Sequence, residues 1–202
     1  AATAQTSLPL QDLSFFKTPG ATWSVASAVK ADLTKPGALI VTPGTGILVN
    51  NPAKEKGVDL YTGMEHGDID LELEYLMAKG SNSGIYLQGR YEMQLMDSWG
   101  VTTARAGDNG GMYQRWDDSK PDGQKGFEGT APRQNVTKAP GLWQKLKISF
   151  QAPRFNAGGQ KIENARIVRA ELNGVVIHED VELTGPTRGS MSATESATGP
   201  LR

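Results

Sequence analysis

The sequence contains no cysteine. This absence excludes disulfides, thiolate nucleophiles and cysteine-ligated zinc sites, although it does not argue against export, because a large core needs no disulfide staples. An excess of charge of one sign is also missing, since 21 Lys and Arg oppose 22 Asp and Glu for a net charge of −1. Without a basic excess, nucleic acid is not an expected partner. No apolar run approaches the roughly 20 residues of a membrane-spanning helix, so we expect no membrane span.

Several patterns that define large enzyme classes are missing as well. The chain has no P-loop, no dinucleotide-binding fingerprint, no Ser-His-Asp arrangement and no useful helical periodicity. Short alternating segments separated by turn residues recur instead, which is typical of an all-β sandwich or barrel. The length of 202 residues fits one such domain. Strands are predicted at residues 22–29, 38–41, 47–50, 68–78, 84–89, 91–97, 111–114, 142–151 and 165–183. The last segment is broken by Asn173-Gly174, a strong hairpin signal.

The connections and the N-terminus carry two further signals. Residues 98–110 and 115–141 are polar, rich in Gly and Pro, and without periodicity. Loops of this length in a compact domain usually carry function. Ala2-Thr3-Ala4 has the A-x-A form of a signal-peptidase site. A removed leader and a chance run of small residues would both give this pattern, and the first interpretation predicts export.

An acidic strand is predicted in GDIDLELEYLMA. Its apolar residues alternate with Asp70, Glu72 and Glu74, which therefore share one face at intervals of about 7 Å. Carboxyl groups separated by about 5 to 9.5 Å can carry out glycoside hydrolysis, one as acid and the other as base or nucleophile. A solvated outer face of a sheet gives the same pattern, so both interpretations stay open at this point.

A second polar strand face is predicted in SNSGIYLQGRYEMQLMD. The residues expected to point outward, with a change of phase in the middle, are Tyr86, Gln88, Arg90, Glu92 and Gln94. If this segment shares a sheet with the acidic strand, Glu92 lies within reach of Glu72 or Glu74. Neighbouring carboxylates separate in pKa, which gives one acid and one base. An ordinary polar sheet surface is the alternative.

Aromatic and oxygen-rich side chains flank these strands. Rings with a polar edge suit the apolar face and the hydroxyls of a sugar, and the candidates are Trp99, Tyr113 and Trp116. His66 precedes the acidic strand and could serve the site or be structural. Asp117-Asp118 with Asp122 could hold a divalent cation such as calcium, although the spacing differs from that of an EF-hand loop. No other cofactor is indicated.

The stretches NSGIYLQGRYEMQLMDSWG, GDIDLELEYLMAKGSNSGIY, GGMYQRW and the run from PGLWQKLKISF to GPTRG resemble the 3-keto-disaccharide hydrolase family. The resemblance covers residues 12–202 and leaves residues 1–11 as a tail. It implies a concanavalin A-like jelly-roll sandwich of two antiparallel sheets. It also implies bacterial export to the periplasm or the cell exterior, with outer-surface association as one form. The family's activity is cleavage of glycosides whose sugar carries a ketone at carbon 3.

The motif positions carried over from the family are Glu74, Asn82, Ser83, Gly84, Glu92, Gln94, Asp97, Tyr113, Trp143 and Asn173-Gly174. Family members continue after Gly-Pro-Leu with a further segment that forms a strand. We therefore expect residues 12–202 to stop before the family's last strand.

The leading hypothesis is an exported enzyme that cleaves 3-keto-glycosides, with Glu92 or Glu74 as the catalytic carboxylate. It would act by hydrolysis, or by elimination followed by hydration with Arg90, His66 or a bound cation steadying the enolate. The predicted substrate-binding residues are Asn82, Ser83, Tyr86, Gln88, Arg90, Gln94, Asp97, Trp99, Tyr113, Trp116 and His66. The alternatives are a non-catalytic carbohydrate-binding module and a scaffold protein of a polysaccharide system, because one sandwich fold serves many functions. The sequence indicates neither a metal requirement nor an oligomeric state.

Overall fold

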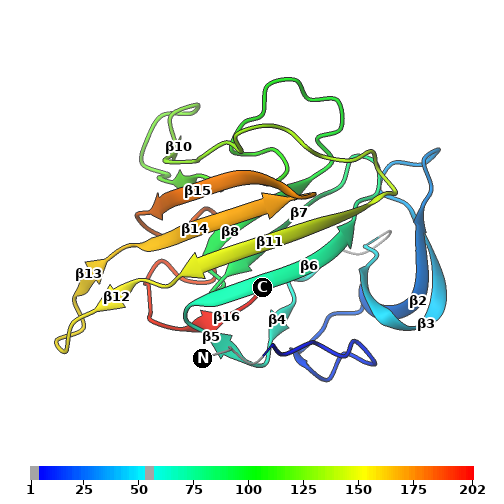
Figure 1. Ribbon diagram of the computed structural model, residues 1–202, viewed down its shortest axis with the longest axis horizontal. Helices are drawn as coiled ribbons and strands as arrows, with labels where there is room; N and C mark the ends of the chain where they lie inside the picture. Colours follow the sequence, from blue (N-terminus) through cyan, green and yellow to red (C-terminus); the bar gives the residue numbers. More distant parts are fainter. Residues whose placement is uncertain (1–4, 53–56) are drawn as a thin grey trace.

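The computed structural model describes residues 5–52 and 57–202, and within these ranges every regular element is a β-strand (Figure 1). All strand pairs there are antiparallel. The described chain accordingly has no helix long and apolar enough to cross a membrane. The Ala2-Thr3-Ala4 motif lies outside the described residues.

The strands fall into a long and a short group. The longer strands are β2 (Trp23–Ala31), β3 (Leu39–Asn50), β6 (Ile69–Leu76), β7 (Asn82–Leu87), β8 (Tyr91–Met96), β11 (Trp143–Gln151), β14 (Ala165–Leu172) and β15 (Val175–Leu183). The shorter strands are β1 (Phe16–Lys17), β4 (Tyr61–Thr62), β5 (Glu65–His66), β9 (Arg115–Trp116), β10 (Gly126–Phe127), β12 (Arg154–Phe155), β13 (Lys161–Glu163) and β16 (Gly199–Pro200).

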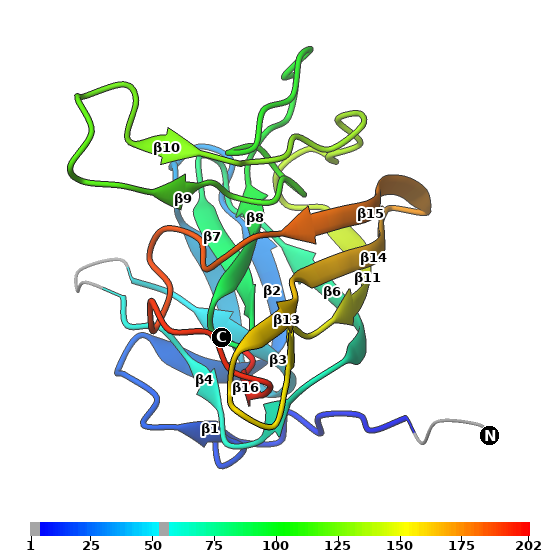
Figure 2. The same ribbon diagram turned by 90° about the vertical axis from the view of Figure 1, so that its left-hand side faces the viewer.

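Two layers enclose the main core, as Figures 1 and 2 show. One layer is a four-stranded sheet in the order β15-β14-β11-β6, and the other is the β7–β8 hairpin, extended by a bridge from Met93 to Met112. Apolar side chains at alternating positions of the strands pack between the two layers. The fully or nearly fully buried ones include Leu87, Tyr91, Met93, Leu95, Leu146, Ile148, Ile167 and Leu172. The prediction of an all-β jelly-roll sandwich is confirmed.

Turn chemistry explains the two hairpins that build these layers. At the β14–β15 turn, Asn173 and Gly174 have φ angles of 54° and 82°, as the Asn-Gly signal predicts. At the β7–β8 turn, Gln88 and Gly89 have φ angles of 52° and 64°, and Arg90 N donates to Leu87 O over 3.0 Å. Positive φ at both central residues of such a turn matches the twist of the strands that it joins. The β14–β15 connection has two residues, and the β7–β8 connection has three, because Leu87 pairs with Tyr91.

Most predicted strands are found with shifted ends, such as β7 at Asn82–Leu87 instead of residues 84–89, and two predictions differ more. The segments predicted at residues 38–41 and 47–50 form one long strand, β3, which pairs with β2 along its length through a register shift. Residues 111–114 do not form a continuous strand, although Met112 bridges both Met93 and Thr130. Residues 44–46, between Pro43 and Ile47, have no pairing partner in β2, so the proline and the glycines make a bulge within β3 instead of ending it.

The chain after β15 returns along the β7–β8 hairpin and borders both of its edges (Figure 2, orange to red). Thr187 N donates to Arg90 O over 3.0 Å on the β8 side. On the β7 side, Tyr86 N donates to Arg202 O over 2.7 Å, and Arg202 N donates back to Tyr86 O over 3.1 Å. This C-terminal segment therefore surrounds the turn end of the hairpin, where the polar residues of β7 and β8 lie.

Candidate functional site

The candidate site lies on the face of the β7–β8 hairpin that is turned away from the core. Strand alternation puts Met93 toward the core and Glu92 and Gln94 on the opposite face. Glu92 is directly across from Tyr86, and Gln94 is across from Gly84. Because Met93 bridges Met112, and Tyr113 N donates to Glu92 O over 2.9 Å, the Tyr113 side chain lies on the same face as that of Glu92.

Glu92 is buried, although it is on the outward face of the hairpin, with 8% of its surface exposed. Its backbone N–H donates to Thr187 Oγ1 over 3.1 Å. Its carboxyl group lies across Gly84, where a methyl group in place of the glycine hydrogen would overlap Oε1 of Glu92. Gly84 has no positive φ, so the glycine is needed here for space rather than for backbone conformation.

The Tyr86 hydroxyl is shared between two acceptors. It lies 2.7 Å from Oε2 of Glu92 and 2.9 Å from the backbone oxygen of Arg188. A phenol carries one hydrogen and can donate it to one of them at a time. When Glu92 is ionised, Tyr86 donates to the carboxylate. When Glu92 is protonated, it donates to the phenol oxygen, and Tyr86 donates to Arg188 O. Tyr86 can therefore accommodate both protonation states of Glu92.

The charges around Glu92 change the balance between its ionised and protonated forms. Burial raises the pKa of the Glu92 carboxyl above its usual value, while the hydrogen bond from Tyr86 and the charge of Arg202 oppose part of that rise. The guanidinium of Arg202 lies 3.6 Å from the centre of the Tyr86 ring and donates to Gly189 O over 2.7 Å. Asp59, whose charge raises the pKa of Glu92 further, lies 3.6 Å from Nε of Arg202. A carboxyl with a raised pKa is suited to both accepting and returning a proton near neutral pH.

Two polar groups on this face have no protein partner. Oε1 of Glu92 and the side-chain amide of Gln94 make no hydrogen bond with any of the described residues. Among residues 5–52 and 57–202, the side-chain atoms that are both inaccessible to solvent and without a hydrogen-bond partner are in Thr22, Asn50 and Gln88. Glu92 Oε1 and the Gln94 amide are not among these atoms. Glu92 Oε1 and the Gln94 amide therefore each keep a small accessible area on an otherwise buried face.

Three residues predicted to bind substrate are structural instead, and two of them lie at the β7–β8 turn. Gln88 is fully buried, and its Nε2 donates to His66 O and Ala197 O. Arg90 is 8% exposed and donates to Thr194 O over 2.8 Å and Gln88 O over 2.9 Å. The prediction of an outward Gln88 and Arg90 is therefore wrong, because both residues belong to the three-residue connection between β7 and β8, where the strand period does not apply. Both side chains hold the C-terminal segment.

His66 is the third of these residues, and its hydrogen bonds are also made within the protein. Its Nε2 accepts the backbone N–H of Gln88 over 2.9 Å, and its Nδ1 lies 2.8 Å from Gly67 O. This pair of contacts requires a neutral ring with its proton on Nδ1. Burial lowers the pKa of His66, which agrees with the neutral form. Arg90 and His66 therefore are not available to stabilise an enolate.

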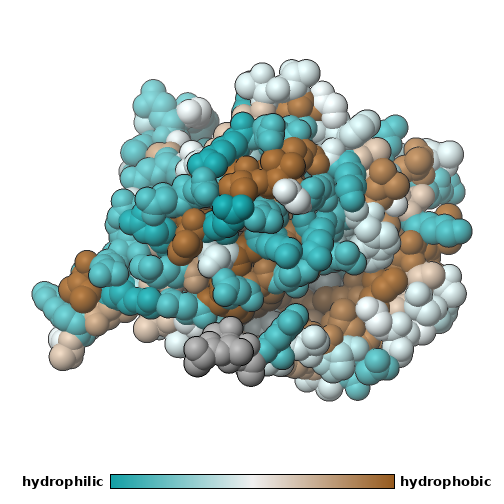
Figure 3. Space-filling model, viewed as in Figure 1, coloured by the Kyte–Doolittle hydropathy of each residue, from teal (hydrophilic) through white to brown (hydrophobic). Residues whose placement is uncertain are grey.

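The acidic strand belongs to the other layer. The predicted proximity of Glu92 to Glu72 or Glu74 required a shared sheet, but β6 pairs with β11 and β8 pairs with β7. Glu72 forms ion pairs with Lys145 at 2.5 Å and Lys147 at 3.3 Å. Glu74 is exposed and lies across from Lys145 on the same outer face, which is mostly hydrophilic in Figure 3. The solvated-face interpretation of this strand is correct, and Glu74 does not lie with Glu92.

Four further candidates lie near β7 and β8, and they differ in whether they share the face of Glu92. Asn82 is on the Glu92 face at the open end of β7, while Ser83 is on the face of Leu95 and Met93. Asp97 accepts the backbone N–H of Gly80 over 2.8 Å and that of Trp99 over 3.3 Å, so it fixes a turn. Trp99 lies beyond the end of β8 and is 61% exposed. Asn82 is the member of this group that shares the face of Glu92.

The oxygen-rich stretch at 117–122 is occupied by local contacts. Asp117 Oδ1 accepts from the backbone and hydroxyl of Ser119, and Asp122 pairs with Lys125 at 3.0 Å. In the described part of the chain, no three His, Asp or Glu side chains come together in a group that could hold a metal ion. Asp117 and Asp122 are therefore engaged in local contacts, and a divalent cation at this stretch stays a prediction.

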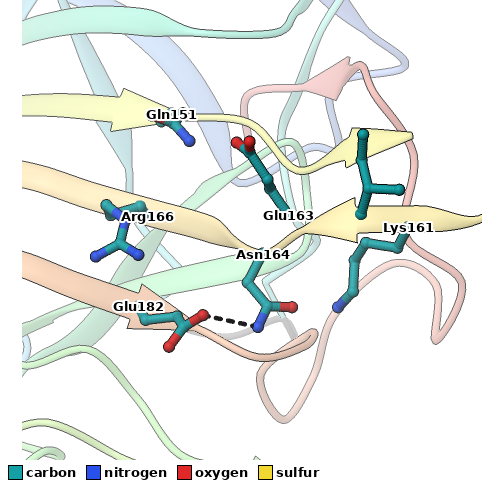
Figure 4. Close-up of a pocket in the computed structure, with 7 residues that line it drawn as sticks. Gln151, Lys161, Glu163, Asn164, Arg166 and Glu182 are labelled. Carbon is teal, nitrogen blue, oxygen red and sulfur yellow. Dashed lines mark hydrogen bonds between the residues drawn. The ribbon is translucent and has the colours of Figure 1, made fainter. Parts of the chain in front are cut away.

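Two hollows on the described surface bear on the site. One, of about 450 Å³, is on the outer side of β11, β14 and β15 and is lined by Gln151, Lys161, Ile162, Glu163, Asn164, Arg166 and Glu182 (Figure 4). Several of its polar groups have partners: Arg166 pairs with Asp180, Lys161 pairs with Glu195, and the Asn164 amide donates to Glu182. The other, of about 410 Å³, is lined by Trp116, Thr187, Arg188 and Gly189 among others, and so adjoins Tyr86 and Glu92.

Sequence reasoning missed the residues that enclose Glu92 from the C-terminal segment, namely Thr187, Arg188 and Arg202. They are about 100 positions away from Glu92 in the sequence and reach it through the return of the chain after β15. The stretch that contains Thr187 and Arg188, TGPTRGS, has no periodicity that could indicate a partner, and neither has GPLR, which contains Arg202. Asp59 likewise carries no local signal.

Comparison with known proteins gives one family and several related structures. The model of a family described as 3-keto-alpha-glucoside-1,2-lyase-like domain matches residues 12–202. A crystal structure of a "putative glycosyl hydrolase" from Parabacteroides distasonis ATCC 8503 is 23% identical with a TM-score of 0.62, covering 96% of this chain and 72% of that chain. A second one from the same organism is 16% identical with a TM-score of 0.52, covering 96% and 88%. No curated protein matches the sequence.

The two kinds of match carry different weight. At these identities, the solved structures show a shared fold, which agrees with the sandwich described above. The family match extends over nearly the whole chain and indicates an enzyme that acts on glycosides.

Proposed function

Because the chain belongs to the family of 3-keto-alpha-glucoside-1,2-lyase-like domains, we propose that it cleaves glycosides whose sugar carries a ketone at carbon 3. Glu92 is the residue that moves the proton in this reaction. The observation that carries the proposal is the pair of unpartnered polar groups, Oε1 of Glu92 and the amide of Gln94, on one mostly buried face. A carboxyl next to an amide gives a proton-transfer group and a group that can bind sugar oxygens.

Elimination across carbons 1 and 2 is the route that this site supports best. A ketone at carbon 3 acidifies the hydrogen on carbon 2, and the ionised carboxylate of Glu92 takes that proton. The electrons of the C–H bond form a double bond between carbons 2 and 1, and the bond from carbon 1 to the leaving oxygen breaks with its electron pair. Glu92 then returns the proton to the leaving oxygen. Addition of water to the double bond would complete a net hydrolysis.

The neighbours of Glu92 have defined roles in this proposal. Tyr86 donates to Glu92 while it is a carboxylate and turns its proton to Arg188 O when Glu92 becomes protonated. The Gln94 amide donates to a sugar oxygen, where it can stabilise the charge of the enolate. Asn82, on the same face, helps to orient the ring. Burial excludes water, which strengthens each of these interactions.

The test is an assay with a 3-keto-glucoside in heavy water, with the unoxidised glucoside as control. We expect release of the leaving group from the 3-keto compound alone, and deuterium at carbon 2 of the sugar product. A hydrated sugar product without deuterium at carbon 2 would show direct hydrolysis, whereas release of the unsaturated sugar, which has no hydrogen at carbon 2, would show elimination without hydration. Equal cleavage of the unoxidised glucoside, or cleavage of neither compound, would contradict the proposed substrate class.

A further inference from the structure

The hollow beside Glu92 contains an arginine that stacks on a tryptophan. The hollow has a volume of about 410 Å³, within the size range of small-molecule sites. The guanidinium carbon of Arg188 lies 3.8 Å from the centre of the Trp116 ring. This contact covers one face of the indole, and the indole N–H donates to Asp118 Oδ1 over 2.9 Å. Trp116 therefore offers a ligand less free surface than the sequence suggested, and the exposed group at this place is the guanidinium.

Arg188 is held in place at both ends. Its backbone N–H donates to Gln114 O over 3.0 Å, and its backbone oxygen accepts from Tyr86 over 2.9 Å. Trp116 supports the end of its side chain. A guanidinium fixed in this way loses little conformational freedom when it binds, which favours affinity.

Within the described residues, the hydrogen-bond donors of this guanidinium have no partner. Among residues 5–52 and 57–202, no carboxylate lies within 4.0 Å of the Arg188 side chain, and the side chain makes no hydrogen bond. Arg115, the other arginine of the hollow, pairs with Glu128 at 3.0 Å and also donates to Thr184. The two arginines thus differ, because the charge of Arg115 is compensated by a described carboxylate and that of Arg188 is not.

We propose that Arg188, supported by Trp116, binds a carboxylate on the leaving-group part of the substrate, such as a uronic acid residue. The forked donors of a guanidinium match the two oxygens of a carboxylate. Asp118 also lines the hollow, and its charge disfavours a dianionic phosphate relative to a singly charged carboxylate. The carboxylate belongs to the leaving group and not to the keto sugar, because the proposed function puts the keto sugar over Glu92 and Gln94, and the hollow lies beside these two residues. This inference rests on the proposed function.

Binding experiments with the full chain test this inference separately from catalysis. The probes are the methyl glycosides of glucuronate, glucose and glucose 6-phosphate, titrated calorimetrically into the wild-type protein. We expect glucuronate to bind at least about tenfold more tightly than glucose, the value of one charge-assisted pair. Arg188→Met should remove this preference, and Arg188→Lys should retain only part of it. The preference should also weaken as salt is added.

The results that would overturn the inference are equal binding of glucuronate and glucose, a preference that survives in Arg188→Met, or tighter binding of the phosphate. Lys161→Met, in the hollow on the outer side of β14, is a matched control and should leave the preference intact. Failure of the proposed function would look different. In that case no 3-keto-glucoside would be cleaved, whereas the preference for glucuronate would still report on Arg188.

Discussion

Tyr86 and Glu92 face each other across β7 and β8, with 2.7 Å between the phenol oxygen and Oε2 of the carboxyl group. The second acceptor of the same phenol, Arg188 O, belongs to the segment that borders the hollow. Glu92 can therefore gain or lose a proton without leaving Tyr86 unsatisfied. Catalysis by a buried carboxyl needs such a neighbour, because a group that stabilised only one protonation state would hold the proton in place.

Replacing Glu92 tests its role as the proton-transfer group. Glu92→Gln keeps the shape and removes titration, so turnover of a 3-keto-glucoside should fall by at least about 100-fold. Binding of the substrate, measured calorimetrically, should change little. Glu74→Gln is the matched control, since Glu74 is exposed on the outer face of the other layer, and its turnover should equal that of the wild type. Activity of Glu92→Gln within a factor of a few of the wild type would rule out this role.

Tyr86→Phe should shift the pH profile rather than only lower the rate. The carboxylate of Glu92 would lose a hydrogen-bond donor, and burial, which already raises its pKa, would be opposed less. The pKa of Glu92 should rise further. If Glu92 must be ionised to take the proton from carbon 2, the acidic limb of kcat/KM should move to higher pH.

The direction of that shift distinguishes the two possible orders of proton transfer. A movement of the alkaline limb to higher pH would show that Glu92 starts the reaction as an acid. A profile that keeps both limbs in place, with only a lower rate, would mean that Tyr86 has a purely structural role.

Gly84→Ala should displace the Glu92 carboxyl group. A methyl group at this position overlaps Oε1 of Glu92, which is the flexible end of a side chain and can move aside. We therefore expect a loss of turnover of more than about tenfold, since misplaced reacting groups lower rates steeply, with little change in the melting temperature. Gly158→Ala is the control, because its added methyl group would meet only Asn156 Oδ1 at 3.4 Å. Equal turnover of the Gly84→Ala variant and the wild type would contradict the assigned position of the carboxyl group.

Acid should destabilise the fold through His66. The pKa of His66 is lowered in the folded protein, chiefly by burial, and a proton on Nε2 would also face the N–H of Gln88. Below the ordinary pKa of about 6.5, the unfolded chain binds a proton that the folded chain resists, so the contribution is present above that pH and is lost as the pH falls. Urea unfolding at about pH 7.5 and about pH 5 should show a smaller acid loss in His66→Gln than in the wild type. Equal losses in both proteins would contradict a buried neutral His66.

The fold and part of the site can be predicted from the sequence because strand alternation and turn conformation are local properties of the backbone. Strand alternation predicts that Met93 faces the core and that Glu92 lies on the opposite face. The Asn173-Gly174 pair predicts the hairpin of β14 and β15, and the structure has both features. The same local rule failed at Gln88 and Arg90. There β7 ends at Leu87, two residues before the predicted end of the strand at residue 89, and positive φ angles at Gln88 and Gly89 end the alternation.

Only the tertiary structure decided which residues surround Glu92. The acidic strand has a regular pattern, but its partner is β11, whose Lys145 and Lys147 neutralise Glu72 on the outer face. Strand pairing between distant segments depends on the packing of whole layers, and no short stretch specifies it. The contacts of Tyr86 with Arg188 and Arg202 arise in the same way, from a chain that returns after about 100 residues. Local sequence therefore determined the face on which Glu92 lies, and long-range packing determined its burial and its proton-sharing partner.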